Sequence, residues 1–106
     1  MSEVTDRILV SGDIDRRIHF NTGLDLNTDG YVATDLTFKV QRPDATTFNM
    51  TNVRQIDDAA TGQVSVLTTT GNLNQTGEFI VQITASHAGK PTVRSTIMSF
   101  MVEDAL

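Results

Sequence analysis

The sequence predicts an all-β fold, either a sandwich or a small barrel, and three observations support that prediction. Residues 77–86 alternate apolar side chains such as Phe79 and Val81 with polar ones, a period of two typical of a half-buried strand. Residues 92–103 form a second β-rich segment after a short break with a glycine and a proline, as in a β-hairpin. No window sustains the spacing of an amphipathic helix over three turns.

Two short strands are expected near the N-terminus. Residues 7–10 form a short apolar run, residues 11–13 (Ser-Gly-Asp) form a turn, and residues 16–20 form the second strand. Residues 1–6 are expected to be a flexible tail. Residues 21–30 are dense in Asn, Asp, Thr and Gly, so they are predicted to be a loop.

The middle of the chain predicts a strand, a tight turn and a weaker strand. Residues 35–41 alternate strictly and lead into residues 42–45, where Pro43 suits the first central position of a type I turn. Residues 46–50 and 52–56 carry weaker strand signals, and we interpret them as one bent strand.

The C-terminal half completes the set of about six to eight strands that turn spacing predicts. Residues 57–62 are predicted as a loop, residues 63–67 as a strand, and residues 68–75 as a crossing toward the final hairpin. The predicted core comprises Phe38, Val40, Val64, Val66, Phe79, Val81, Ile83 and two or three of Ile97, Met98, Phe100 and Val102. Because residues 97–102 are apolar on both faces, their second face is covered either by a loop of this chain or by another subunit.

Length and composition indicate one globular domain, residues 1–106. The chain has 106 residues, 39% hydrophobic and 20% charged, which suffices for a core without cross-links. Cysteine is absent, which excludes disulfides, thiol catalysis and cysteine-based zinc sites but leaves the redox compartment open.

Charge narrows the classes of partner. The formal net charge is −5 and the basic residues are scattered, so we expect no nucleic-acid partner. No segment has the length of an apolar membrane span, so no membrane partner is expected either. The N-terminus carries acids where a signal peptide would need basic residues, and we expect synthesis in the cytoplasm.

The sharpest motif is the segment from Asp25 to Asp29 and the residues after it. It resembles the start of an EF-hand calcium loop, with oxygen side chains at positions 1, 3 and 5 and Gly30 at position 6. Position 12, which should supply a bidentate carboxylate, is Leu36, and a strand rather than a helix follows. We interpret the segment as an Asx-rich turn in which Gly30 takes a positive φ. A calcium-stabilised adhesin-type module remains an alternative.

The two histidines are not predicted to be ligands or bases. His19 lies in a predicted strand and His87 in the hairpin turn, and each lacks a second histidine or carboxylate at ligand spacing. We interpret both as ordinary surface or packing residues.

Other chemical signals have simpler explanations. Asp57 and Asp58 are adjacent acids whose side chains project in different directions, so we predict a solvated loop. Asn49 and Asn74 fit the glycosylation sequon, which has no meaning without a secretory signal. Phosphate loops and nucleophile motifs are not present. We therefore predict no catalytic, cofactor-binding or metal residues, no cofactor, and a protein that is not an enzyme.

The order of features from Leu36 onward resembles a known family. Residues 39–44 (KVQRPD), 58–64 (DAATGQV), 73–79 (LNQTGEF) and 100–104 (FMVED) occur in the same sequence as in one small sandwich. That sandwich is the immunoglobulin-like domain at the N-terminus of upper baseplate proteins of tailed bacteriophages. The resemblance covers roughly residues 31–104 and implies an immunoglobulin-like antiparallel β-sandwich.

The chain departs from the pattern of this family at two points. Ala45 stands where the pattern has glycine, which predicts a turn of a different type. Upper baseplate proteins continue into further domains, whereas this chain ends at Leu106, so we expect a stand-alone accessory of the capsid, neck or tail.

The implied function is that of a non-enzymatic structural protein located in the virion. Its expected partners are other virion structural proteins, with a homo-oligomer as a further expectation. A carbohydrate- or host-surface-binding module remains the alternative, for which Tyr31 is the candidate exposed aromatic side chain.

Overall fold

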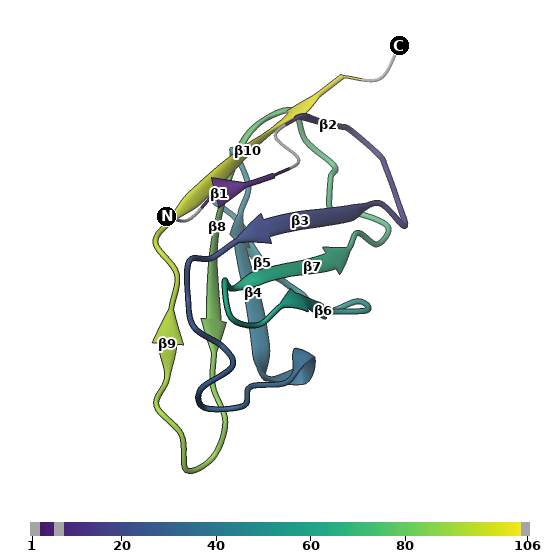
Figure 1. Cartoon of the computed structure of the whole chain (residues 1–106). Coiled ribbons are helices and arrows are strands. Elements are labelled where there is room, and N and C mark those ends of the chain that lie inside the picture. Colours follow the sequence, from purple (N-terminus) through teal and green to yellow (C-terminus); the bar gives the residue numbers. More distant parts are fainter. Residues whose placement is uncertain (1–2, 6–7, 105–106) are drawn as a thin grey trace.

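Two β-sheets packed face to face form the molecule, which confirms the predicted all-β sandwich (Figure 1). The structure is a computed structural model and describes residues 3–5 and 8–104. In the order of pairing, the four-stranded sheet contains β1 (Glu3–Val4), β3 (Arg17–Asn21), β7 (Gln63–Leu67) and β6 (Gln55–Asp58). The six-stranded sheet contains β2 (Ile8–Val10), β10 (Met98–Glu103), β8 (Gly77–Ala85), β4 (Leu36–Gln41) and β5 (Thr47–Met50), and β9 (Val93–Arg94) also pairs with β8.

The number of strands exceeds the prediction because short strands extend the sheets. Within the described residues, seven strands have at least four residues, and β1, β2 and β9 are shorter. A 3₁₀ helix, η1 (Ala33–Asp35), precedes β4. Among the described strands, β2 pairs parallel with β10 and every other pairing is antiparallel.

The strands are arranged in the same order as in the two sheets of an immunoglobulin domain. The order β1-β3-β7-β6 matches strands A, B, E and D, and β10-β8-β4 matches G, F and C, with β5 as an added strand beside C. In Figure 1 the strands of the four-stranded sheet run across the direction of β4, β8 and β10 rather than alongside them. In sandwiches with aligned sheets, by contrast, the strand directions of the two sheets lie within about 30° of each other.

The core lies between the sheets and contains the predicted residues. All seven predicted side chains of β4, β7 and β8 are buried, and so are Met98, Phe100 and Val102. Phe20 on β3 contacts Phe38 on β4 across the sandwich, with ring centroids 5.5 Å apart. Within the six-stranded sheet, Phe79 stacks on Phe100 at 5.3 Å. Edge-tilted and offset ring pairs of this kind add to the energy of burial.

Residues 46–56 do not form one bent strand, so that interpretation was wrong. β5 pairs with β4 in one sheet, whereas β6 pairs with β7 in the other. The chain crosses between the sheets at residues 51–54, where Val53 adopts a φ of 44°. A left-handed residue reverses the chain abruptly, which a pattern of β-branched residues does not reveal. The predicted loop at 57–62 is also shorter, because β6 extends to Asp58.

The turn at residues 42–45 has the predicted hydrogen bond. The Ala45 N–H donates to the Arg42 carbonyl at 2.9 Å, as in a β-turn with Pro43 at its first central position. Ala45 adopts a φ of 71°, the conformation that glycine would take there. Alanine therefore takes the left-handed position of a three-residue hairpin loop, and the difference in turn type from the family stays a prediction.

The N-terminal segment is partly ordered rather than a flexible tail. β1 pairs with β3, placing Val4 opposite Phe20, and the Val4 side chain is buried. Burial of an apolar side chain between the sheets explains why this segment is held. The remaining residues of the predicted tail, 1, 2 and 6, lie outside the described residues.

Candidate functional site

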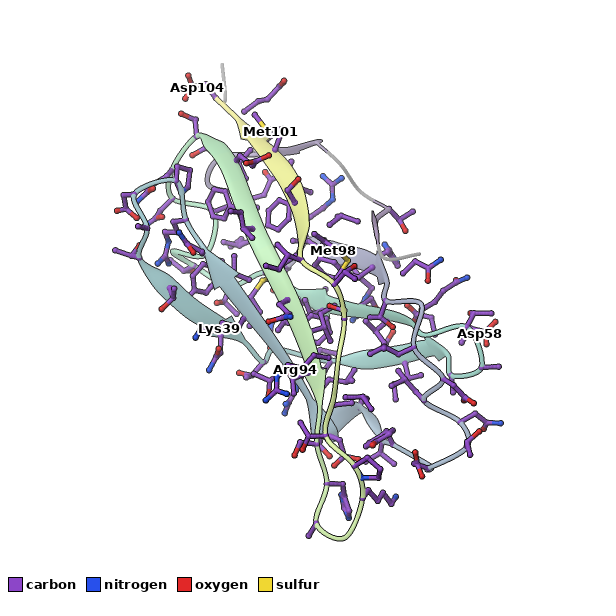
Figure 2. The ribbon with its side chains drawn as sticks, turned by 90° about the vertical axis from the view of Figure 1, so that its left-hand side faces the viewer. Lys39, Asp58, Arg94, Met98, Met101 and Asp104 are labelled. Carbon is purple, nitrogen blue, oxygen red and sulfur yellow. The ribbon has the colours of Figure 1, made fainter. Side chains whose placement is uncertain are left out.

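The solvent side of the six-stranded sheet is the candidate functional site, and we call it the outer face. Its side chains alternate with the buried ones along each strand. The residues of the outer face are Thr37, Lys39, Gln41, Thr47, Asn49, Glu78, Ile80, Gln82, Thr84, Arg94, Ile97, Ser99, Met101 and Glu103. Figure 2 looks onto this sheet, with Met101 toward one end, Arg94 toward the other and Lys39 between them.

A shallow hollow of about 190 Å³ lies in the middle of the outer face. It is lined by Lys39, Gln41, Thr47, Ile80, Gln82 and Ile97. Small-molecule sites usually enclose about 300–1,000 Å³, so this hollow is small for a metabolite. Its size and its mixture of two isoleucines with amide, hydroxyl and ammonium groups suit a side chain that projects from another protein.

A β-bulge exposes Ile97 beside the hollow. β8 pairs with β9 so that Ala85 is opposite Val93, whereas Val81 is opposite Met98, one residue out of that register. Thr96 and Ile97 therefore both lie opposite Gln82, and one extra residue on a strand is a β-bulge. The Ile97 side chain is 68% exposed, so it is not part of the core. Residues 92–103 consequently form two strands rather than one continuous one.

Ser95 holds the bulge in place from the buried side. Its N–H donates to the Ile83 carbonyl at 2.8 Å, and its hydroxyl accepts the Ile83 N–H at 3.0 Å. The Gln82 side-chain amide donates to the Ser95 carbonyl at 2.9 Å. A side-chain oxygen thus replaces the backbone carbonyl that a regular strand would offer. Sequence reasoning missed this residue, because a serine between two strand segments has no distinctive pattern.

The exposed apolar side chains of the outer face are Ile97 and Met101, and Met101 is 44% exposed. Val10 on β2 is 36% exposed and lies opposite Glu103 on the neighbouring strand. Apolar side chains gathered on a sheet surface mark contact sites more often than isolated ones do. Two apolar side chains of residues 97–102, Ile97 and Met101, therefore lie on the outer face beside the polar Ser99, and loops of the described chain leave them uncovered.

A second group of polar contacts ties two loops together at one end of β4 and β8. The Asp35 carboxylate accepts the Val32 N–H at 2.9 Å and lies 2.8 Å from His87 Nδ1. The Val32 amide first, and then His87, hold the pKa of Asp35 below its ordinary value. His87 therefore has a carboxylate partner that its sequence neighbours did not reveal, because the partner is 52 positions away.

Tyr31 is buried, so its assignment as an exposed aromatic was wrong. Its side chain is 5% exposed, and its hydroxyl donates to the Pro91 carbonyl. Lys90 donates to the Gly30 carbonyl at 3.3 Å and lies 5.8 Å from the Tyr31 ring centroid. The ring is apolar enough to join the core, while its hydroxyl reaches a backbone acceptor in the facing loop.

The calcium-like segment is an Asx turn, as the sequence predicts. Asp25 accepts hydrogen bonds from the Asn27 N–H at 2.9 Å and from the Thr28 N–H at 3.1 Å, and the Thr28 hydroxyl also donates to it. These bonds, the Thr28 hydroxyl foremost, lower the pKa of Asp25. Gly30 has a φ of 66°. The carboxylate is thus occupied by its own loop, and the described residues contain no cluster of three His, Cys, Asp or Glu placed to hold a metal.

The remaining candidates, His19, Asp57 and Asp58, lie on the four-stranded sheet. His19 is exposed on the four-stranded sheet. Asp57 is the extra residue of a bulge in β6 and accepts the Ser65 hydroxyl at 3.4 Å, whereas Asp58 accepts the Ala60 N–H at 3.1 Å. The two carboxylates therefore have separate hydrogen-bond partners.

Comparisons with known proteins add no family. No protein-family model matches this chain, and no curated protein matches it. Within the described residues, no helix has the length and apolarity needed to span a membrane. Fold and surface together define the class as a β-sandwich protein with a partly apolar outer face.

Proposed function

We propose that this protein is a non-enzymatic structural component of a tailed bacteriophage virion, either a capsid decoration protein or a neck or tail adaptor. The observation that carries the proposal is the outer face, where Ile97 and Met101 are exposed and Ile97 lines a hollow too small for most metabolites. Such a surface suits contact with a neighbouring protein.

Two further observations support the phage and immunoglobulin-like parts of the proposal. The ordered motifs at residues 39–44, 58–64, 73–79 and 100–104 resemble those of phage baseplate sandwiches. The strand order of both sheets agrees with the order in immunoglobulin domains.

In the proposed mechanism, the sandwich is a rigid body whose outer face and sheet edges contact neighbouring virion proteins. The strands at the ends of the two sheet orders are β2, β5, β1 and β6. Exposed edges carry unpaired backbone groups that can add to a partner. Weak contacts repeated around a symmetric shell or ring give firm attachment without a large single interface.

The carbohydrate-binding alternative loses its main support. Tyr31 is buried, and Phe48, the described aromatic residue outside the buried core, has the Arg42 guanidinium 4.0 Å from its ring centroid. A sugar platform normally needs an open ring face on a loop or concave surface.

Co-sedimentation with purified phage particles tests the proposed function. Particles made without this chain should bind the added protein, and saturation should occur at a fixed number of copies per particle. A sandwich of similar size and charge from an unrelated source is the control and should stay in the supernatant. A chain that remains in the supernatant but is retained on a glycan column would contradict the virion role and favour the carbohydrate alternative.

A further inference from the structure

The strand registers place the residues of the outer face in rows. Ile80 on β8 lies opposite Ser99 on β10 and opposite Gln41 on β4, and we call this row the midline. Positions along the sheet can then be given by the number of β8 residues that separate them from the midline.

The side of the midline toward Gly77 is acidic. Glu78 lies two residues from the midline, opposite Met101, and Glu103 lies two residues further along β10. All three side chains are exposed.

The side toward Ala85 is basic. Lys39 lies opposite Gln82, two residues from the midline, and Arg94 lies opposite Thr84, four residues from it. The bulge places Ile97 opposite Gln82 as well, on the same side of β8 as Arg94 and Met101. The outer face thus carries an acid–apolar group on one side of the midline and an apolar–base group on the other.

We propose that a second copy of this chain packs on the outer face, related by a two-fold axis that runs along the midline, across the strands. Such an axis exchanges the two sides of the midline and leaves each strand facing its own counterpart. Ile97 of one copy then faces Met101 of the other at two residues from the axis. Arg94 of one copy faces Glu103 of the other at four residues from it.

The same two-fold rotation also pairs the residues near the middle of the outer face. Ile80 and Ser99 lie on the axis and face their own counterparts. Lys39 of one copy faces a position that lies one strand spacing, about 4.8 Å, to the side of Glu78 of the other, and a lysine side chain spans that sideways offset. Each charged residue therefore meets the opposite sign and each exposed apolar residue meets another, which favours a second copy over an unrelated partner.

The area suits a weak dimer. The six strands of this sheet have 30 residues in total, and each residue covers about 3.3 Å by 4.8 Å of the sheet. The outer face therefore offers roughly 500 Å² per copy, less than the roughly 800 Å² that each partner contributes to a standard interface and in the range of weak, transient contacts. A second copy of the chain would be one neighbour of the structural protein proposed above, but the dimer does not depend on the virion role.

Sedimentation equilibrium of the purified chain with a charge-swap cycle tests the dimer. We expect a monomer–dimer equilibrium in the micromolar range, with Glu103→Arg and Arg94→Glu each raising Kd at least about tenfold. Because the double variant restores both pairs with reversed signs, its Kd should return to within about threefold of the original. Gln55→Arg, which adds a cation to the four-stranded sheet, is the control and should leave Kd unchanged.

A chain that stays monomeric throughout the concentration series would overturn the proposal. So would a dimer that the single swaps do not weaken, or a double variant as weak as the single ones. Because no phage component is present, these results are independent of particle binding. Failure of the dimer and failure of the virion role are therefore distinguishable.

Cysteine cross-linking tests the position of the axis. The chain has no native cysteine, so Ser99→Cys introduces a single thiol on the midline, and a short bis-maleimide should join two copies efficiently. Thr37→Cys is the matched control, because Thr37 is exposed on the same face but lies opposite Thr84, four residues from the midline. Its two copies would be about 26 Å apart in the proposed dimer and should not be joined. Equal cross-linking of both variants would contradict the proposed axis.

Discussion

The Ser95 hydroxyl accepts the backbone N–H of Ile83 at 3.0 Å, in the place where a regular strand would offer a carbonyl oxygen. Both residues are buried, with 3% of Ser95 and none of Ile83 exposed. This one hydrogen bond allows the chain to bulge outward after residue 95 while the interior stays satisfied. The bulge in turn exposes Ile97 and shapes the hollow of the outer face.

Ser95→Ala should lower the free energy of unfolding by about 1–3 kcal/mol, because it leaves the buried Ile83 N–H without its acceptor. Urea denaturation followed by circular dichroism measures this loss. Ser99→Ala, on the exposed side of β10, is the control and should change stability by no more than about 0.5 kcal/mol. Equal stability of the two variants would mean that the Ser95 hydroxyl does not satisfy the strand.

Gly62→Ala should destabilise the protein by about 3 kcal/mol or more. Gly62 has a φ of 80°, and an added Cβ would lie 2.5 Å from the Leu24 carbonyl oxygen and still closer to Thr22 Oγ1. An alanine in this left-handed conformation costs about 1–2 kcal/mol, and displacing the loop at Thr22 to relieve the clash adds a further cost. Gly71→Ala, at a φ of 87° with open space around it, isolates the strain and should lose about 1–2 kcal/mol. Similar melting temperatures for both variants would argue against the close packing at Gly62.

Ala45→Gly should stabilise the protein by about 0.5–1 kcal/mol. Alanine at a φ of 71° is strained, and glycine relieves that strain. This gain exceeds the stability that is lost because glycine gives the unfolded chain more conformational freedom. Ala88→Gly provides the comparison, since Ala88 is exposed and does not have a positive φ. That variant should lose about 0.4–1 kcal/mol in the same thermal unfolding experiment. A loss at both positions would place Ala45 in an ordinary conformation.

Stability should fall in acid, partly through Asp35. The Val32 amide, and then His87, lower the pKa of this carboxyl below its ordinary 3.8, and its side chain is 9% exposed. A carboxyl with a depressed folded-state pKa stabilises the fold above the unfolded pKa. That contribution is lost as the pH falls from about 4 through the lower folded pKa.

Asp35→Asn should therefore be less stable than the native chain at neutral pH, with a shallower decline below about pH 4. Denaturation midpoints measured across the acid range for both proteins compare the two slopes. Parallel curves for the native chain and the variant would show that Asp35 contributes nothing to the acid dependence.

The sequence predicted the inward faces of the strands well because alternation is a local property. Phe38, Val64 and Phe79 each belong to a strict period of two, and burial follows from that period whatever the neighbouring strand is. The sheet to which a strand belongs is not local, and β5 and β6 show the difference. Their separation depends on a left-handed Val53, which no pattern announces.

The candidate site was less predictable than the fold. The apolar second face of residues 97–102 was visible in the sequence, but the exposure of Ile97 depends on a register change between β9 and β10. The partnership of Asp35 and His87 joins two loops that are far apart in the chain. Tyr31, the candidate exposed aromatic of the carbohydrate alternative, is instead buried, and the Pro91 carbonyl offers its hydroxyl a hydrogen-bond partner.

The central claim is that alternating side chains meet between two sheets and leave the outer face free for contacts. Chemical denaturation of Phe79→Ala tests it most directly, because Phe79 is fully buried and stacks on Phe100. The account predicts a loss of about 3–5 kcal/mol, against a clearly smaller loss for the partly exposed control Phe48→Ala. An unchanged unfolding midpoint for Phe79→Ala would contradict the assignment of the inner and outer faces.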